Sequence, residues 1–241
     1  MTALPTKRDE TWRYSDLEAV ARVWPVATHS HAVAPGETLV LPILIDGGTD
    51  DVLIEDHEIE VGAGARAEAQ VVVTGGRLGR AFIKARMGEG AHLEITGVII
   101  GGGTETHEIV TRVTHAEPNA TSMQTVRAIL SGQSTGSYLG KVAVARGAQK
   151  TDAGQSAKAM LLDRTATANL KPELEIYADD VKCAHGATVG ELDQQSLFYL
   201  ASRGLPPAEA KALLLRAFVG GLFEGNEPFT AAIDRALERI L

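Results

Sequence analysis

Cysteine is almost absent from the sequence, with Cys183 the single one among 241 residues. One cysteine forms no internal disulfide and supplies no cysteine pair for a zinc site, which agrees with a reducing compartment. Aromatic residues are also sparse, at 5%, whereas glycine is abundant, with 25 residues. A core of small aliphatic side chains connected by many tight turns fits this balance.

Positive charge is in deficit, because 23 lysines and arginines face 31 aspartates and glutamates, giving a net charge of −8. A general nucleic-acid-binding protein needs a basic face for the phosphates, so the composition argues against that class. No apolar run reaches the roughly 18 residues of a membrane span. Residues 1–10 end in four charged side chains with no apolar run after them, unlike a signal peptide. We therefore expect a cytoplasmic protein that binds neither nucleic acid nor a membrane.

A phosphate-binding loop is also missing. Gly140-Lys141 is followed by Val142, so the pair lacks both the required upstream glycine and the serine or threonine that would hold magnesium. The pair is therefore not a phosphate-binding loop.

Residues 36–190 contain one β-rich segment after another, several of them alternating apolar and polar residues as half-buried strands do. No helical pattern of ten or more residues separates them, which argues against a βαβ fold. The segments are 39–45, 51–54, 70–73, 93–96, 98–100, 108–113, 126–130, 138–144 and 174–177.

A loose repeat of turn-forming residues underlies these segments. Gly62-Ala63-Gly64-Ala65, Gly88-Glu89-Gly90-Ala91, Pro118-Asn119-Ala120 and Gly147-Ala148 follow one another at intervals of 26, 29 and 28 residues. A period of this length with strands and no helix predicts one coil of a β-solenoid per repeat. A β-sandwich with similar turns is the alternative that the periodicity leaves open.

The two ends of the chain differ from this core, which divides it into residues 1–35, 36–190 and 191–241. The first part carries both tryptophans, and Ser15 and Glu18 fit a capping box for a short helix. The last part predicts three helices: one over about 194–202 after the N-cap Asp193, one from the prolines at 206–207 to Gly225, and one from Pro228. Their apolar faces can pack on the β core, on each other or on a partner. The second helix bears an apolar stripe that includes Leu213, Leu214, Phe218 and Leu222.

Cys183 and His185 are the candidate ligating residues. Residues two apart in a strand share a face, so both side chains can meet one ligand. The alternative is that Cys183 is a small buried hydrophobe and His185 a hydrogen-bonded turn residue. His29 and His31 have the same spacing, and we interpret them as surface or interface residues.

Two segments carry a resemblance to a known family. Residues 181–190, VKCAHGATVG, continue into Leu192-Asp193 and then into LFYLASRG at 197–204. This run resembles the C-terminal signature of the SufB/SufD family of iron–sulfur cluster assembly proteins, with Ala184 where serine is usual. Residues 10–15, ETWRYS, are similar to the family's entry segment. SufB members carry further cysteines, so the chain is most similar to a compact SufD with a shortened N-terminal region.

The resemblance implies a mainly β fold, with a right-handed parallel β-helix core, a short N-terminal segment and a small C-terminal helical unit. It implies a scaffold subunit of the SufBCD complex, not an enzyme. A SufB-like subunit would join by pairing of the two β-helices, and a SufC-like ABC ATPase would dock on the helical tail through the stripe of Leu213, Leu214, Phe218 and Leu222. Homodimerisation of the isolated chain is left open.

The resemblance also implies that an iron–sulfur cluster is built at the interface with SufB, with His185 and Cys183 as transient ligands and no cofactor bound stably by the chain alone. Iron in such clusters takes thiolate or imidazole ligands. One cysteine and one histidine cannot hold a cluster, so the other ligands would come from the partner. Two alternatives stay open: a homo-oligomeric β-helix enzyme with its active site in a surface groove, and a SufB-like protein that scaffolds a cluster alone, against which the single cysteine weighs.

Overall fold

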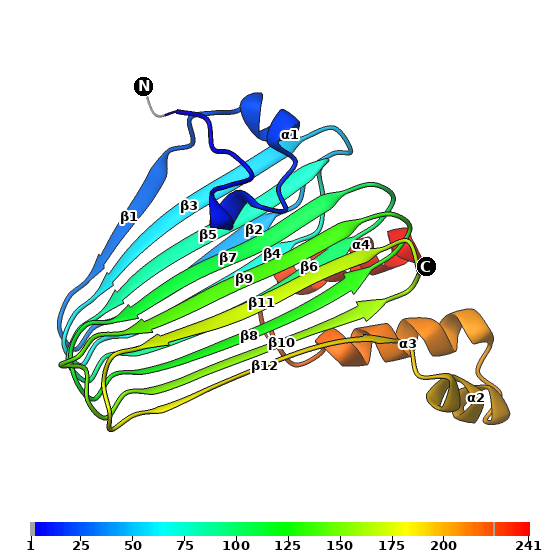
Figure 1. Ribbon diagram of the computed structural model, residues 1–241. Helices are drawn as coiled ribbons and strands as arrows, with labels where there is room; N and C mark the ends of the chain where they lie inside the picture. Colours follow the sequence, from blue (N-terminus) through cyan, green and yellow to red (C-terminus); the bar gives the residue numbers. More distant parts are fainter. Residues whose placement is uncertain (1–2, 224) are drawn as a thin grey trace.

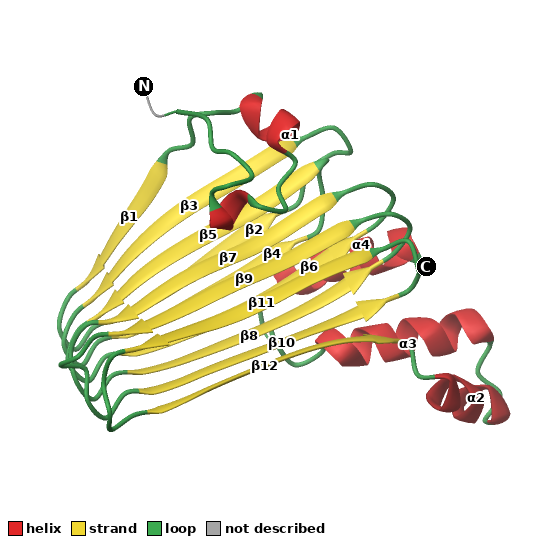
Figure 2. Ribbon diagram, in the orientation of Figure 1, coloured by secondary structure: helices red, strands yellow, loops and turns green. Residues whose placement is uncertain are grey.

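The chain folds as a parallel β-helix in a computed structural model that describes residues 3–223 and 225–241. Over these residues the strands form two parallel sheets, in the orders β1-β3-β5-β7-β9-β11 and β12-β10-β8-β6-β4-β2. Successive strands alternate between the sheets, so that each pair makes one coil (Figures 1 and 2). The mainly β fold, the parallel β-helix and the small helical C-terminus are therefore confirmed.

The first sheet contains β1 (Thr28–Val33), β3 (Val52–Val61), β5 (Leu78–Met87), β7 (Thr106–His115), β9 (Thr135–Val144) and β11 (Thr167–Ile176). The second contains β2 (Thr38–Ile45), β4 (Arg66–Val73), β6 (His92–Gly101), β8 (Thr121–Leu130), β10 (Asp152–Leu161) and β12 (Lys182–Glu191).

The space between the sheets is filled by one continuous core of small aliphatic side chains. Alternate residues of each strand point into it, and the in-register pairing stacks like upon like from coil to coil, as with Ile45, Val73 and Ile99. A one-residue shift of any strand would turn its apolar set outward, so the core itself fixes the register.

One column of left-handed residues explains the sequence repeat. Gly64, Gly90 and Asn119 have φ values of 64°, 62° and 61°, and each donates its backbone N–H to the next coil. Glycine adopts this conformation without strain and asparagine tolerates it. The predicted turns at Gly64, Gly90 and Asn119 are thus confirmed. The next position is occupied by Lys150, with φ 62°, so the assignment of Gly147 to the repeat was three residues too early.

The N-terminal segment crosses the outer face of the first sheet (Figure 1). It contains the 3₁₀ turn η1 (Glu10–Trp12) and the short helix α1 (Leu17–Ala21). The predicted capping role of Ser15 was wrong, because Asp16 is the N-cap and accepts a hydrogen bond from the Ala19 N–H. The Ser15 hydroxyl instead donates to the buried Glu108 carboxylate. The first sheet already begins at β1, within residues 1–35.

The C-terminal helices have two different surroundings. The helix α4 (Glu227–Ile240) lies on the outer face of the second sheet, where Phe229, Ile233 and Leu237 pack against Val98 and neighbouring strand residues. The helix α3 (Pro207–Val219) packs Leu215 and Val219 into the same cluster at its C-terminal end, whereas its N-terminal end and α2 (Gln194–Ser202) extend past the ends of the strands (Figure 1). Asp193 caps α2 as predicted. The second helix ends at Val219, earlier than the predicted Gly225. None of the helices in the described residues is long and apolar enough to cross a membrane.

His115 makes the stability of the β-helix sensitive to acid. Its ring is fully buried, its Nε2 lies 2.8 Å from the Ser122 hydroxyl, and its Nδ1 has no hydrogen-bond partner among the described residues. Burial disfavours the charged ring and lowers the pKa of His115 to about 4.

We expect the free energy of unfolding to fall as the pH drops from 7 to 5. Unfolded His115 takes up a proton near its ordinary pKa of about 6.5, whereas the folded ring stays neutral, so acid favours the unfolded chain by roughly 2 kcal/mol at pH 5. Buried His107, whose pKa is also lowered to about 4, acts in the same direction. Urea denaturation at pH 7.5 and 5.0 measures the loss, and His115→Gln should reduce it. An equal pH dependence in the wild type and in His115→Gln would contradict this account.

Candidate functional site

The last coil of the β-helix presents two open strand edges. Among the described residues, β11 and β12 are the outermost strands of their sheets, and β12 is paired with β10 on one side alone. Every residue of β12 is exposed apart from half-buried Cys183. An edge of this kind carries unpaired N–H and C=O groups, which can accept a further strand.

Cys183 and His185 both lie on the interior face of β12. The register pairs Cys183 with Ala153 and His185 with Gln155, and both partners are buried inside the β-helix. Because in-register parallel strands keep the same face, the two side chains are directed towards the open interior of the coil, about 6.6 Å apart along the strand. Their spacing in sequence predicts this shared face.

The two residues differ as metal ligands. Cys183 packs against the main core, and burial, together with nearby Asp152, raises the pKa of its thiol, while the Ala153 backbone acts in the opposite direction. The thiolate is the form that binds metal, so the raised pKa works against ligation by Cys183 in the free chain. His185 is exposed and accessible. No three histidine, cysteine, aspartate or glutamate side chains of the described residues are placed to hold a metal ion together. Within this chain, therefore, the end of the β-helix offers a partial ligand set at most.

A buried polar network lies directly behind this end and was not predicted from the sequence. Thr111, Gln124, Tyr138 and Gln155 occupy interior positions in the last coils, and each is at least 97% buried. Each of their hydrogen bonds joins a strand of one sheet to a strand of the other sheet. The available signal was a polar residue at an inward position of an otherwise apolar strand, which becomes visible once the register is known.

The four predicted docking residues differ in their burial. Phe218 and Leu222 are half-buried and pack against the apolar cluster between the helices and the second sheet. Leu214 is half-buried, whereas Leu213 is 48% exposed. Of the four, Leu213 is thus the most available to a partner.

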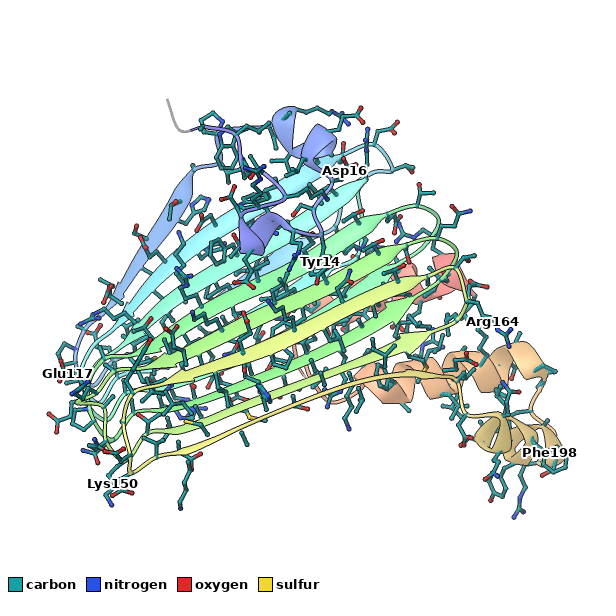
Figure 3. The ribbon with its side chains drawn as sticks, in the orientation of Figure 1. Tyr14, Asp16, Glu117, Lys150, Arg164 and Phe198 are labelled. Atoms are coloured by element: carbon teal, nitrogen blue, oxygen red, sulfur yellow. The ribbon has the colours of Figure 1, made fainter. Side chains whose placement is uncertain are left out.

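More apolar surface is exposed on α2, which the sequence did not single out. Phe198 is 76% exposed and Tyr199 55% exposed, and Phe198 projects at the tip of the molecule, far from the β-helix (Figure 3). Between α2 and α3 lies a groove of about 410 Å³, walled by Leu197, Phe198, Ala201, Pro207 and Ala210. Large exposed apolar side chains beside a groove mark an interaction surface.

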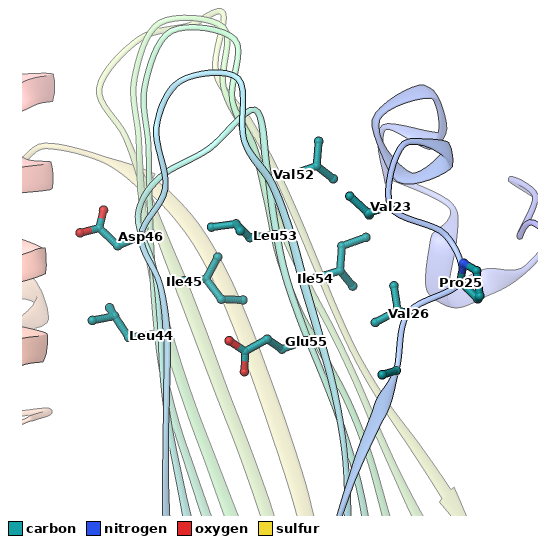
Figure 4. A pocket seen from close by; sticks show the side chains of 11 residues that line it. Val23, Pro25, Val26, Leu44, Ile45, Asp46, Val52, Leu53, Ile54 and Glu55 are labelled. Carbon is teal, nitrogen blue, oxygen red and sulfur yellow. The ribbon is translucent and has the colours of Figure 1, made fainter.

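A second hollow lies at the opposite end of the β-helix (Figure 4). It has a volume of about 400 Å³, with Val23, Ile45, Leu53 and Glu55 in its wall. The Glu55 carboxylate lies 2.9 Å from His57 Nε2, and His57 Nδ1 lies 3.1 Å from His31 Nε2. His29 stacks on the same ring, so the two histidines predicted to be at a surface or interface form a cluster with His57 on the first coil.

One sequence match to a hydrolase motif has no matching structure. Residues 132–136, GQSTG, have the spacing of a nucleophile elbow, which requires a sharp turn from a strand into a helix. Here Ser134 lies between β8 and β9, is fully buried, and donates its hydroxyl to the Ser131 carbonyl at 2.8 Å. Ser134 is therefore a turn residue of the solenoid.

The fold and the site together define a class: a parallel β-helix whose last strand is an open edge with an inward histidine and cysteine. Comparison with known protein families identifies this class. The model of the family "SUF system FeS cluster assembly, SufBD core domain" matches residues 39–218. The chain therefore belongs to the SufBD family of iron–sulfur cluster assembly proteins, as the sequence motifs predicted.

Individual relatives agree with this assignment. The chain is 36% identical over 137 residues to the iron–sulfur cluster assembly protein SufD of Escherichia coli, which covers 57% of this chain and 32% of that protein. It is 36% identical over 157 residues to the chloroplastic protein ABCI7 of Arabidopsis thaliana, covering 64% and 33%. It is 30% identical over 210 residues to a SufBD family assembly protein of Mycobacterium bovis, covering 81% and 53%. The chain thus spans about a third to a half of the length of these curated relatives.

Proposed function

We propose that this chain is a SufD-like scaffold subunit that pairs with a SufB-like subunit, supports assembly of an iron–sulfur cluster at their interface, and docks a SufC-like ABC ATPase. The observation that carries the proposal is the open last coil, where an unpaired strand edge and His185 occur together. In this role the chain is cytoplasmic and not itself an enzyme. The cluster is the cargo of the machine and not a resident cofactor of this chain.

Strand addition at β11 and β12 is supported by the surface that the last coil leaves open. Besides Cys183 and His185, the inward positions of this coil carry Leu170, Leu174 and Val189, and Val189 is 50% exposed. A partner strand would satisfy the backbone groups of the edge and bury these apolar side chains in one step.

A cluster at this interface would be ligated in part by His185. Its imidazole can bind iron as the neutral ring, and the remaining ligands would come from the SufB-like partner. Incomplete ligation by either subunit suits a cluster that is built and then released.

The ATPase would dock on the α2–α3 surface formed by Phe198, Tyr199 and Leu213. These side chains are exposed on helices that extend away from the β-helix, so docking there leaves the open strand edge free for the other subunit. Aromatic anchors beside a groove are typical of helix-in-groove interfaces.

The proposal is tested by co-purification of this chain with the SufB-like and SufC-like proteins of its host, followed by light scattering to obtain the mass of any complex. A stable heteromer is the expected result. A chain that stays monomeric or forms homodimers alone would contradict it.

His185→Ala should leave folding intact and lower the iron and sulfide content of the reconstituted complex roughly tenfold or more, because the cluster loses a ligand that binds its iron directly. Thr188→Ala is the matched control, since Thr188 lies on the same exposed strand and points to the opposite face. Cys183→Ser should be milder than His185→Ala if the buried thiol is structural, and equally severe if it is a ligand. An unchanged cluster content in His185→Ala would remove this residue from the site.

A second candidate is a homo-oligomeric β-helix enzyme, favoured by the hollow beside Glu55, where a carboxylate and two histidines form a hydrogen-bonded chain. Such an enzyme is active without partners. Turnover by the purified chain alone, lost in Glu55→Gln, would support this candidate over the scaffold.

A further inference from the structure

The polar network behind β12 is an ordered chain of hydrogen bonds inside an otherwise apolar core. Gln124 Oε1 accepts from the Thr111 hydroxyl at 2.6 Å and from the Tyr138 hydroxyl at 3.0 Å. The Tyr138 oxygen in turn accepts from Gln155 Nε2 at 3.2 Å. Burying polar groups in a core is costly unless they are paired, so such a network needs a reason.

The fold makes room for this network. A β-carbon at Gly140 would lie 2.1 Å from the Tyr138 hydroxyl and 2.5 Å from Gln155 Nε2. Any larger residue there would displace both groups. The glycine at this strand position therefore leaves the space in which the tyrosine hydroxyl and the glutamine amide meet.

The directions of the hydrogen bonds decide which end of the Gln155 amide is free. The single Tyr138 proton is given to Gln124, so the Tyr138 oxygen can only accept, and Gln155 must face it with its NH₂ group. Gln155 Oε1 is left buried, with no hydrogen-bond partner in the part of the chain that the structure describes. An unsatisfied buried acceptor is unfavourable and rare in native proteins.

The register places His185 next to this acceptor. Gln124, Gln155 and His185 are consecutive partners on β8, β10 and β12, and all three point inward. Adjacent strands are about 4.8 Å apart, within reach of a hydrogen bond between side chains of this length. A partner strand on β12 would confine the now exposed His185 ring to this interior face.

We propose that Gln155 is a positioning residue: its Oε1 accepts the N–H of the His185 ring, which fixes one tautomer and turns the other ring nitrogen towards the open end of the β-helix. Ligating histidines commonly donate their second N–H to a fixed acceptor that sets the tautomer and orientation. The Tyr138 hydroxyl, itself fixed by its hydrogen bond to Gln124, holds the glutamine in place from behind. This inference rests on the proposed cluster role of His185.

The test reads the tautomer directly. The chain is labelled with ¹⁵N-histidine, and the chemical shifts of the His185 ring nitrogens are recorded by NMR in the complex with the SufB-like partner, or in the chain alone if no complex forms. The His185 signals are assigned by their loss in His185→Ala. We expect a single tautomer in the wild type and a mixture of both in Gln155→Met, which keeps the side-chain length and removes the acceptor.

The matched control is Thr111→Val, which disturbs the same network but leaves Gln155 Oε1 in place and should keep the single tautomer. If Gln155→Met does not fold, Gln155→Leu, which also removes the acceptor, should give the same mixture. A single tautomer in Gln155→Met or Gln155→Leu, or a mixture in Thr111→Val, would overturn the proposal.

The same variants separate this inference from the proposed function. We expect the cluster content of the complex to fall about tenfold in Gln155→Met. A normal cluster content in both His185→Ala and Gln155→Met would overturn the cluster role of the site. A loss in His185→Ala together with an unaltered tautomer and cluster content in Gln155→Met would overturn the positioning role alone.

Discussion

Replacement of Arg80 by methionine should lower the free energy of unfolding by about 3–5 kcal/mol, because it leaves a buried carboxylate without its cation. Arg80 and Glu108 are both fully buried and form an ion pair between β5 and β7. The Arg80 guanidinium also donates to the Thr11 carbonyl at 2.7 Å, and its carbon lies 3.9 Å from the centre of the Trp12 ring. The arginine thus fastens the N-terminal segment to the outer face of the first sheet.

The matched control is Arg86→Met, on the same face of the same strand. Arg86 lies 4.0 Å from Glu60, and the two side chains are 57% and 64% exposed, so its loss should cost less than about 1 kcal/mol. Urea denaturation measures both changes. The double variant Arg80→Met with Glu108→Met should recover much of the loss, because the charge left unpaired is removed as well. Equal stabilities of Arg80→Met and Arg86→Met would contradict the assignment of this buried pair.

The Arg80–Glu108 pair shows how far the sequence predicts the fold. The two residues are 28 positions apart, which is one coil of the repeat. The turns at Gly64, Gly90 and Asn119 predict that repeat because few residues adopt their backbone conformation. Once the repeat is known, opposite charges one period apart are candidates for pairing. The burial of the pair depends on Trp12 and Ser15, which arrive from another part of the chain, and no local pattern predicts that.

The strands that the sequence did not predict have a common cause. The inward residues of β10 are Ala153, Gln155, Ala157 and Ala159, which have little intrinsic preference for strands. The segment is a strand because β8 and β12 pair with it on both sides. The strand β5 likewise has alanines, Ala81 and Ala85, at inward positions. Tertiary pairing therefore decides these strands, and local propensity does not.

The candidate site was predicted in part. The spacing of Cys183 and His185 was enough to predict a shared face, and the family resemblance pointed to the same residues. What the spacing could not supply is the difference between the two, because the burial that raises the Cys183 pKa comes from the core of neighbouring coils. Gln155 could not be recognised either, since its relation to His185 exists only through the strand register.

Replacing Phe198 and Leu213 together by glutamate should weaken binding of the SufC-like ATPase by about 100-fold or more, if each side chain is an anchor of the interface. Both side chains are exposed on helices beyond the β-helix, so the charges disturb no core packing and the stability of the chain should stay within about 0.5 kcal/mol of the wild type. Binding of the purified ATPase by calorimetry and urea denaturation of the variant together test this expectation. Met123→Glu is the matched control, because Met123 is a comparably exposed apolar residue, 41% exposed, on the outer face of the second sheet.

Phe218 and Leu222 make the test discriminating, because they belong to the same predicted stripe and have different surroundings. Both pack against the cluster that joins the helices to the second sheet. Phe218→Ala should therefore lower the free energy of unfolding by roughly 2–4 kcal/mol and affect ATPase binding only through folding. Strong loss of binding in the Phe198 and Leu213 variant with normal stability would locate the docking surface on the exposed side of α2 and α3. Normal binding in that variant, with loss in a folded Phe218→Ala, would instead place the contact at the base of α3, where the helix meets the β-helix.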